Sequence, residues 1–359
     1  MASYRKLKSG WKVTISQRDE NGKLRQTSKQ GFATKLEARR YAATIEQDID
    51  GVKKAKQDIL FLDYYDQWVD TYKRPKVQAS TMIKYRAVHN LIKDNFAGVK
   101  IQDITRTDYQ QFLNRIGQHY AKDSIRIFTS PIKECVRSAI ADDVIVKDFT
   151  QQTEMIYGYQ RRDVEYLTIA EIKKLAQTIE QSLKPTRPIP YVIYTAIYTG
   201  MRLGEIVALE WSDIDFDKQT ISITKSWSSV THEAKSPKTE SSNRAIVVNK
   251  HLLDVLLQLK DNGHDMIFKT LHGMPASRSV NVSLRSFLKK AGINKSGYHF
   301  HSLRHSHVAY LLSKGVDLYA ISKRLGHKDM TVTAKTYAYL IDEYKEKQDQ
   351  QIIKAIDEI

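Results

Sequence analysis

Cysteine is almost absent from this chain of 359 residues, which contains a single one, Cys135. One cysteine excludes an intramolecular disulfide, and it excludes a zinc site built from several thiolates. Its neighbours include Ile132, Val136 and Ile140, so we expect its thiol to lie in a hydrophobic core. This cysteine usage fits a protein that works in a reducing compartment.

Long apolar runs are also lacking. No stretch approaches the roughly 20 apolar residues that a membrane-spanning helix requires, and residues 1–8 have no apolar core of a signal peptide. His299, His301, His305 and His307 lie close together, but no acidic residues accompany them in a metal-binding pattern. We therefore expect a cytoplasmic protein that has no membrane association and needs no metal or other cofactor.

Acidic residues are outnumbered by basic ones. Asp and Glu together number 41 and Lys and Arg number 57, which gives a formal net charge of +16 and a pI near 9.5. Such a surplus favours a polyanionic partner, and nucleic acid is the first choice. The alternative is a basic protein whose lysines only maintain solubility. Residues 1–56 hold 14 Lys and Arg against 6 Asp and Glu, which is half of the whole surplus.

Residues 1–56 are predicted to form a small sheet and one helix. The expected strands are residues 11–15, 23–27 and 29–32. Asn21 and Gly22 favour a hairpin turn, while Thr34 followed three positions later by Glu37 is the pattern of a capped helix start. A sheet this basic suits a DNA surface, and a charged face that only contacts solvent is the alternative.

Residues 61–157 are predicted to be all-helical, because their apolar residues recur at helical spacing. Phe61, Tyr65 and Trp68 follow this spacing, which suits a packed core better than stacking on bases. A basic linker separates this segment from the rest of the chain.

Residues 165–359 are predicted to form a mixed, mostly helical domain, and Thr168 with Glu171 caps its first helix. Strands at residues 220–225 and 244–248, joined by a long polar stretch, supply a small sheet. The fold class is therefore multidomain and mainly α, with a sheet-plus-helix domain first and a helical domain second.

Four short motifs in the last domain point to one reaction. In chain order they are Thr199-Gly-Met-Arg202-Leu-Gly-Glu205, His301-Ser-Leu-Arg304, Leu325-Gly-His327 and Tyr337. Two arginines and two histidines can surround one phosphate, since the planar fork of arginine binds phosphate oxygens in pairs and keeps its charge. Fixed cations of this kind stabilise the negative charge that develops when a phosphodiester is attacked.

The nucleophile of such a reaction must be a hydroxyl, and Tyr337 is the candidate. The ordinary pKa of tyrosine is about 10, so nearby cations must lower it or a neutral His301 or His327 must accept its proton. The alkoxide that leaves needs an acid. Lys238 is suited to this role because it lies in the polar stretch between the two expected strands.

Each of these residues has a structural alternative when it is taken singly. Arg202 alone could form an ordinary salt bridge with Glu205, either histidine could be a structural one, and Tyr337 is one of 20 tyrosines. The joint order and spacing of the four motifs is the observation that favours catalysis.

In these motifs, over about residues 165–345, the chain resembles the tyrosine recombinases, also called the phage integrase family. The resemblance implies that Arg202, Arg304 and His327 hold the phosphate oxygens while His301 assists proton transfer. It also implies that Tyr337 becomes linked to the 3′ end of the cut DNA strand.

The resemblance leaves two assignments open. The hairpin lysine of the family, which protonates the 5′ leaving oxygen, corresponds best to Lys238, and Lys235 and Lys225 are lesser candidates. Tyr339 stands where relatives often have histidine, and it is the second choice of nucleophile.

The rest of the chain resembles the longer integrases of phages and conjugative transposons. This implies an arm-type DNA-binding domain in residues 1–56, a core-binding domain in residues 61–157 and a catalytic domain in residues 165–359, the last two closing around DNA. It also implies a homo-tetramer on paired sites, an excisionase and a host DNA-bending protein. A terminal apolar stripe suits docking into a neighbouring protomer or folding back on its own domain: Ile352, Ile353, Ile356 and Ile359.

We therefore expect a site-specific recombinase of a mobile element that integrates and excises double-stranded DNA. A type IB topoisomerase would share the chemistry but would relax DNA without paired sites. A sequence-specific DNA-binding protein without catalysis would form no covalent product. A general nucleic-acid-coating protein would bind without site preference and with a steep salt dependence.

Overall fold

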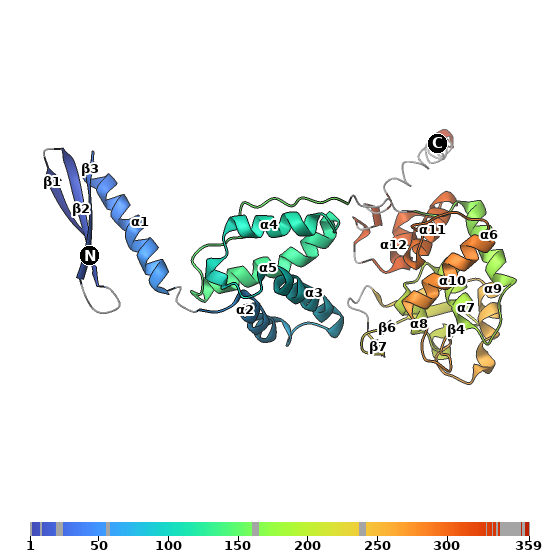
Figure 1. Ribbon diagram of the computed structural model, residues 1–359. Coiled ribbons are helices and arrows are strands. Elements are labelled where there is room, and N and C mark those ends of the chain that lie inside the picture. The colour runs from blue at the N-terminus through green and yellow to red at the C-terminus, as the bar shows by residue number, and fades with distance from the viewer. Residues whose placement is uncertain are drawn as a thin grey trace. The chain divides into compact units, whose positions relative to one another are not determined.

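The computed structural model describes residues 2–7, 9–18, 24–54, 58–159, 165–236, 242–327, 329–331, 333–334, 337, 353 and 356–358. The chain divides into two compact units, Met1–Arg161 and Arg162–Ile359 (Figure 1). The first contains a small sheet with one helix and then a helical bundle, and the second combines helices with short strands. Within the described ranges, no helix is both long and apolar enough to cross a membrane.

The N-terminal sheet has three antiparallel strands in the order β1-β2-β3, and one helix packs on it. Its elements are β1 (Ala2–Leu7), β2 (Gly10–Arg18), β3 (Leu24–Phe32) and α1 (Lys35–Lys54). Val13 and Ile15 lie on one face of β2 and are buried together with Ala38 and Ala42, which are one turn apart on α1. The alternation that predicted a strand at residues 11–15 thus builds the contact between sheet and helix.

The predicted sheet was wrong in one respect, because its third strand is β1 and residues 29–32 continue β3 without a break. Gly31 has a φ of +97°, and it is skipped where the pairing of β2 with β3 shifts between Trp11 and Lys12. A bulge therefore absorbs the extra residue and keeps the strand continuous. Asn21 and Gly22, the predicted turn, lie outside the described residues. The predicted helix cap is present, since the Glu37 amide donates to Oγ1 of Thr34 over 3.1 Å.

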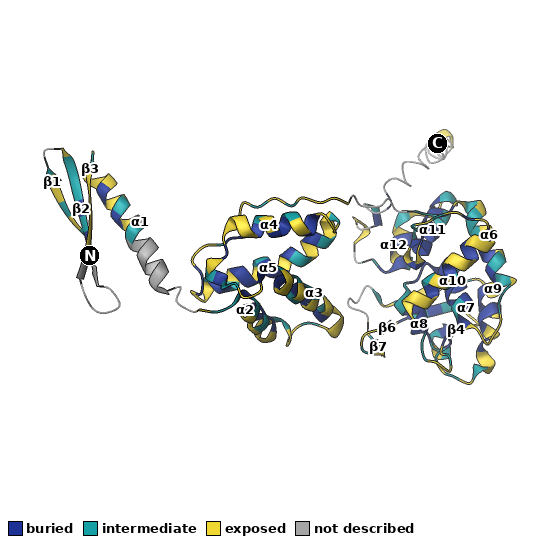
Figure 2. Cartoon of the chain, in the orientation of Figure 1, coloured by how far each residue is buried: buried dark blue, intermediate teal, exposed yellow. Residues whose placement is uncertain are grey.

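The helical bundle is built around aromatic side chains, as predicted. Its elements are α2 (Phe61–Trp68), a π-helical turn (Val69–Lys73), α3 (Ala79–Phe96), a 3-10 turn (Ile101–Asp103), α4 (Arg106–Gly117) and α5 (Lys122–Ala141). Phe61, Tyr65 and Trp68 are buried with Cys135 in one cluster. These helices carry buried residues on one side and exposed residues on the other (Figure 2). Burial of this apolar side holds the bundle together.

Gly117 closes the bundle at the end of α4. Its carbonyl accepts a hydrogen bond from the Gly158 amide over 2.8 Å, so the segment that follows the bundle returns across this helix end. A Cβ atom at this position would collide with the backbone carbonyl of Ile156. The close approach therefore requires a residue without a side chain.

The C-terminal unit combines seven helices of the described segments with two small sheets. Its elements are α6 (Ile169–Glu180), α7 (Pro188–Thr199), α8 (Leu203–Val207), a 3-10 turn (Trp211–Asp213), β4 (Ile214–Asp215), β5 (Thr220–Ile223), β6 (Ser226–Ser228), β7 (Glu233–Lys235), β8 (Arg244–Val247), α9 (Lys250–Leu257), a 3-10 turn (Lys260–Asn262), α10 (Ser277–Lys290), α11 (Phe300–Ser313) and α12 (Leu318–Leu325). One sheet has the order β4-β5-β8, and the other is the hairpin β6-β7. The strands predicted at residues 220–225 and 244–248 are β5 and β8, which pair antiparallel.

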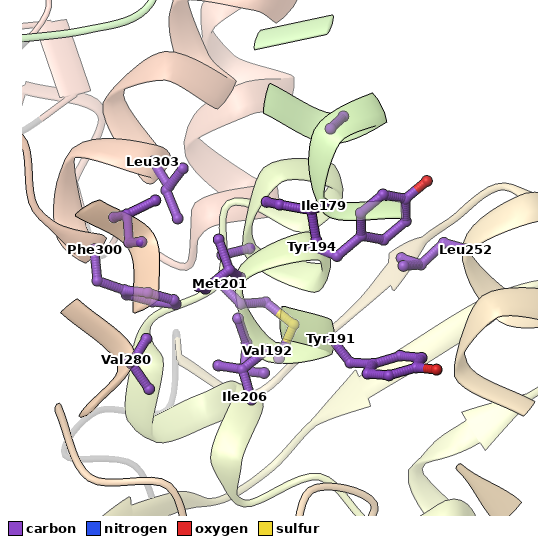
Figure 3. Close-up of a cluster of buried hydrophobic side chains, with 14 of the residues drawn as sticks. Ile179, Tyr191, Val192, Tyr194, Met201, Ile206, Leu252, Val280, Phe300 and Leu303 are labelled. Carbon is purple, nitrogen blue, oxygen red and sulfur yellow. The ribbon is translucent and has the colours of Figure 1, made fainter. Parts of the chain in front are cut away.

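Helix α7 is the centre of this unit, because residues on every side of it are buried. Figure 3 shows Tyr191, Val192 and Tyr194 of α7 surrounded by side chains from other elements, among them Met201 and Leu303. A helix held on all sides gives its C-terminal end a fixed place, and that end leads directly into the Arg202 motif.

Replacing Gly117 by alanine is expected to destabilise the protein. Glycine to alanine inside a helix normally stabilises by about 1 kcal/mol, but the methyl group here meets the Ile156 carbonyl, and overpacking costs about 1–3 kcal/mol. Calorimetric unfolding should show a lower midpoint for Gly117→Ala, while Gln111→Ala on the exposed side of α4 should stay close to the parent. An unchanged or raised midpoint for Gly117→Ala would contradict the packing described.

Candidate active site

Arg202 stands at the junction of α7 and α8. Helix α7 ends at Gly200, whose φ of +66° is the left-handed conformation that favours glycine. A Cβ atom there would also lie 2.7 Å from the ring of the buried His307, so the turn needs glycine twice over. Arg202 then begins the five-residue helix α8, and its side chain stays 39% exposed. It is the accessible arginine of the site.

Glu205 is a buried carboxylate that two arginines share. Its Oε1 accepts from Nη1 of Arg202 over 2.8 Å, and its Oε2 accepts from the Arg202 amide over 2.9 Å and from Nη2 of Arg244 over 2.8 Å. Burial alone would raise the pKa of Glu205, but the hydrogen bond and charge of Arg244, with those of Arg202, lower it on balance. The Glu205 carboxylate is therefore ionised. The salt bridge between Arg202 and Glu205, which was the structural alternative for Arg202, does form, and the Arg202 side chain is nevertheless partly exposed.

Arg304 connects the separate motifs. It is 3% exposed, and Nη1 donates to the carbonyl of Gly200 over 2.9 Å. Its Nη2 donates to the carbonyl of Leu325 over 2.7 Å and lies 2.9 Å from Nε2 of His327. Burial, followed by the charge of Arg202, lowers the pKa of Arg304 to about 9, so the guanidinium stays protonated at neutral pH. One side chain thus contacts the motifs of Arg202 and His327 together.

The protonation state of His327 follows from its partners. A guanidinium can only donate, so Nε2 of His327 accepts from Arg304 and Nδ1 carries the proton. Nδ1 then donates to Oγ1 of Thr333 over 2.6 Å, and Thr333 donates onward to Ser322 over 3.0 Å. Burial, with the charges of Arg304 and Arg202, lowers the pKa of His327 to about 4. His327 is therefore a neutral proton acceptor.

His301 lies at the exposed rim of α11, one turn before the buried Arg304. Desolvation by its neighbours, and then the charge of Arg304, lower its pKa from 6.5, so it too favours the neutral form. Its ring centroid lies 5.3 Å from that of His305, which in turn lies 5.4 Å from that of Tyr337. The histidines and the predicted nucleophile thus form a row of neighbouring rings.

Tyr337 is 1% exposed and packs in an apolar cluster of α11 and α12. The cluster contains Val308, Ala309, Leu312, Ile321 and Leu325. Tyr337 is near enough to Arg304 for a phenolate to raise the pKa of that arginine. The structure therefore places Tyr337 beside the arginine and histidine group, while Tyr339 lies outside the described residues.

The three lysine candidates differ in their surroundings. Lys225 donates to Glu210 over 2.6 Å and to Asp213 over 3.1 Å. Burial opposes, but these two carboxylates raise the pKa of Lys225 on balance, which makes it a poor proton donor. Lys235 lies on β7 with one carboxylate at 4.0 Å. Lys238 lies outside the described residues.

The hairpin that leads toward Lys238 is fixed next to Arg202. Strand β6 packs on α8 at Gly204, where a Cβ atom would lie 2.5 Å from Oγ of Ser226 and 3.0 Å from the carbonyl of Trp227. The glycine of the Arg202 motif thus permits the hairpin to approach the helix that follows this arginine. No spacing in the sequence indicated this contact.

Sequence reasoning also missed Arg244 and Thr333. Arg244 is 7% exposed in its side chain, and the only sign of it was a charged residue at the start of an apolar strand. Thr333 is buried and accepts a hydrogen bond from Nδ1 of His327, but a threonine six residues after a histidine carries no recognisable signal.

Comparison with known proteins agrees with this geometry. The sequence model of the phage integrase family matches residues 165–343, and those of a phage integrase N-terminal SAM-like domain and an Arm DNA-binding domain match residues 60–117 and 2–49. A "Tyrosine recombinase XerC-like" protein of Caldanaerobacter subterraneus subsp. tengcongensis is 27% identical, over 94% of each chain. The ICEBs1 integrase of Bacillus subtilis is 26% identical, over 75% of each chain.

Solved structures share the fold. The Tn1549 transposon integrase in complex with transposon right end DNA has a TM-score of 0.69 at 18% identity, over 82% of this chain and 100% of that chain. A lambda integrase dimer bound to a COC′ core site has a TM-score of 0.61 at 20% identity, over 93% of each chain. The arginines and histidines that converge around one point, and matches that together span three consecutive parts of the chain, lead to one conclusion: the chain belongs to the phage integrase family and is a tyrosine-type site-specific recombinase.

Proposed function

We propose that this recombinase is the integrase of a mobile element, which integrates and excises DNA through a 3′-phosphotyrosine intermediate. The observation that carries the chemistry is the position of Arg304, whose guanidinium contacts both the turn of Arg202 and the turn of His327. These turns lie 104 residues before and 21 residues after Arg304 in sequence, and they meet at this side chain. They meet beside the tyrosine that the family resemblance selects.

Arg202 and Arg304 are proposed to bind the non-bridging oxygens of the scissile phosphate. The Arg202 side chain is 39% exposed and donates one of its N–H groups to Glu205. The hydrogen bonds of Arg304 to described residues use three of its five N–H groups, which leaves two for the phosphate. Fixed donors in a partly desolvated site stabilise the charge of the pentavalent transition state.

Tyr337 is proposed as the nucleophile. Its oxygen forms a bond to phosphorus while the bond from phosphorus to the 5′ oxygen breaks, which leaves a 3′-phosphotyrosine and a free 5′ hydroxyl. The phenol proton passes to a neutral histidine, His327 or His301, and Lys238 gives a proton to the 5′ oxygen. A 5′ hydroxyl of the partner strand reverses these steps, so rejoining needs no nucleotide and no cofactor.

His327 has a second proposed role once it is protonated. A bound phosphate raises the pKa of a nearby histidine, and the charged ring donates from both nitrogens. In the free protein Nε2 accepts from Arg304, so His327 is an acceptor before the reaction and becomes a donor to phosphate oxygen during it.

The N-terminal parts are proposed to bind DNA at two kinds of site. Residues 1–56 would bind arm sites, residues 61–157 would bind core sites together with the catalytic domain of residues 165–359, and the pattern of the domain matches supports this division. Tethering one site raises the effective concentration at the other without new contacts at the point of exchange.

Assembly is proposed as a homo-tetramer on paired sites, with an excisionase and a host DNA-bending protein as accessory partners. Ile353 and Ile356 near the C-terminus are 58% and 60% exposed. Apolar side chains exposed one turn apart suit a neighbouring protomer. A lambda integrase tetramer bound to a Holliday junction has a related fold, with a TM-score of 0.61 at 19% identity.

Covalent trapping tests the assignment of the nucleophile. We expect a protein–DNA adduct when the protein meets supercoiled DNA carrying the junction of its element, without divalent metal, and the reaction is quenched with detergent. Tyr337→Phe should abolish the adduct, because the attacking oxygen is gone, while Tyr339→Phe should retain it. An adduct in both variants would refute Tyr337 as the nucleophile, and tight binding without any adduct would favour a DNA-binding protein without catalysis.

The pH dependence of cleavage tests the proton acceptor. The single-turnover rate should fall toward acid, because a protonated histidine cannot accept the phenol proton. The pKa of His327 is about 4 in the free protein and a bound phosphate raises it, so the midpoint should lie above about 4 if His327 is the acceptor.

Two asparagine variants separate the two candidates for this role. His327→Asn should remove the acid limb if His327 is the acceptor, and His301→Asn should remove it if His301 is. Thermal unfolding at each pH controls for loss of structure, and an acid limb that persists in both variants would exclude both histidines.

A further inference from the structure

Arg244 is a buried arginine that the reaction as described does not use. It opens strand β8, and its side chain is 7% exposed. Four of its five N–H groups have partners: Nε donates to the carbonyl of Arg324 over 2.7 Å, Nη1 to Oε1 of Glu205 over 3.2 Å and to the carbonyl of Ser242 over 3.0 Å, and Nη2 to Oε2 of Glu205 over 2.8 Å. Arg244 thus keeps one N–H group beyond its bonds to described residues, whereas Arg304 keeps two.

Two partners of Arg244 belong to separate segments of the active site, and the third lies beside it in sequence. Glu205 holds the backbone and side chain of Arg202. The Arg324 carbonyl lies in the last turn of α12. Gly326 caps this helix two residues later, and His327 follows Gly326 directly. Ser242 lies two residues before Arg244, at the start of the described range that contains β8. A single guanidinium thus joins the chain near Arg202 and near His327.

Gly326 confirms how closely Arg244 approaches His327. A Cβ atom on Gly326 would lie 2.8 Å from Nη1 and 3.1 Å from Cδ of Arg244. Its φ of +69° already favours glycine as the cap of α12. The glycine of the Leu-Gly-His motif therefore has a second function, which is to let the Arg244 side chain pass beside the turn of His327.

The charges explain what Arg244 does for Arg202. Glu205 has two oxygens, and Arg244 contacts both, so Arg202 makes one side-chain hydrogen bond to it and keeps its other donors. Without Arg244, a buried carboxylate would be left with a single cation, and carboxylate and guanidinium favour a two-bond pair. Arg202 would then be drawn onto Glu205 and away from the phosphate.

We propose that Arg244 is a positioning residue of the phosphate site, which keeps Arg202 available for the scissile phosphate and fixes the turn of His327 beside it. This inference rests on the proposed function, because it assumes that Arg202 binds the phosphate. A purely structural role of Arg244 would predict lower stability with no specific effect on catalysis.

The test compares Arg244→Lys with a matched control, Arg324→Lys. Lysine keeps the charge but cannot form the paired bonds. Arg324 is a partly buried arginine of the same unit, whose side chain donates to Val247, Tyr198 and His307 and to none of the proposed catalytic groups. For each variant we would measure thermal unfolding, affinity for core-site DNA, and the rate of single-turnover cleavage of a core site.

Arg244→Lys should slow cleavage by about tenfold to a hundredfold, which is less than the loss of a transition-state donor itself, while affinity for DNA changes little. Glu205→Gln removes the charge that attracts Arg202. In a protein that already carries Glu205→Gln, adding Arg244→Lys should therefore lower the cleavage rate little further. If Arg324→Lys lowers the cleavage rate, its factor should instead multiply with the factor of Glu205→Gln, because the two substitutions act independently.

A neutral scissile group gives a second readout that lower stability would not change. In a methylphosphonate substrate one charged oxygen is replaced by a methyl group, so less cationic stabilisation is needed. The gap in rate between Arg244→Lys and the parent should narrow on this substrate, whereas the gap for Arg324→Lys should not. Should Arg244→Lys fail to fold, the neutral pair Glu205→Gln with Arg244→Gln is assayed on both substrates, and it should match Glu205→Gln alone.

The outcomes distinguish this inference from the proposed function. If the parent forms no adduct that depends on Tyr337, the proposed function fails. If the parent cleaves and Arg244→Lys cleaves at the same rate, only the positioning role of Arg244 is overturned. The same holds if Arg244→Lys lowers the cleavage rate by the same factor on both substrates and this factor multiplies with that of Glu205→Gln.

Discussion

The buried guanidinium of Arg304 is the constraint on which the rest of the site depends. Taking a full charge out of water is costly unless its donors find acceptors, and here the acceptors are the carbonyls of Gly200 and Leu325 and the ring of His327. Both carbonyls lie at helix ends, at or beside a glycine in the left-handed conformation. Helices α7 and α12 must therefore end where Arg304 of α11 can reach them. The place of Arg202 after Gly200, and of His327 after Gly326, follows from satisfying this one charge.

Burial, together with these cations, sets the protonation of the histidines. Burial and the nearby arginines lower the pKa of His301 and bring those of His305 and His327 to about 4. At neutral pH these rings are therefore uncharged in the free protein. The arginines that are proposed to bind the phosphate thus help to keep the neighbouring histidines able to accept a proton. In the proposed reaction, the charge of the bound phosphate offsets that of the arginines, so a histidine is protonated more easily when the phenol loses its proton.

Much of this could be predicted from sequence because the controlling interactions are local. The caps at Thr34 and Thr168, the aromatic core of the bundle and strands β5 and β8 all follow from spacing within a few residues. Strand β1 escaped because charged residues interrupt its alternation, and it forms through pairing with β2. Arg244 escaped because its partners, Glu205 and Arg324, are 39 and 80 residues away. The assignments of Lys238 and Tyr339 lie outside the described residues and stay predictions.

The site also constrains how the chain can bind DNA. Arg304 is 3% exposed and the Arg244 side chain 7%, so Arg202 is the arginine of this group that offers substantial surface to a phosphate. Binding that DNA makes equally in the ground state and the transition state does not speed the chemical step. A site whose charges are mostly buried and paired contributes little to the general affinity for DNA. Its charges can therefore act on a single phosphate. The affinity must then come from elsewhere, and half of the surplus positive charge lies in residues 1–56, far from these motifs in the sequence. Separating the charge that binds DNA from the charge proposed to act on the phosphate lets binding be tight, and sensitive to salt, without displacing the arginines of the proposed site.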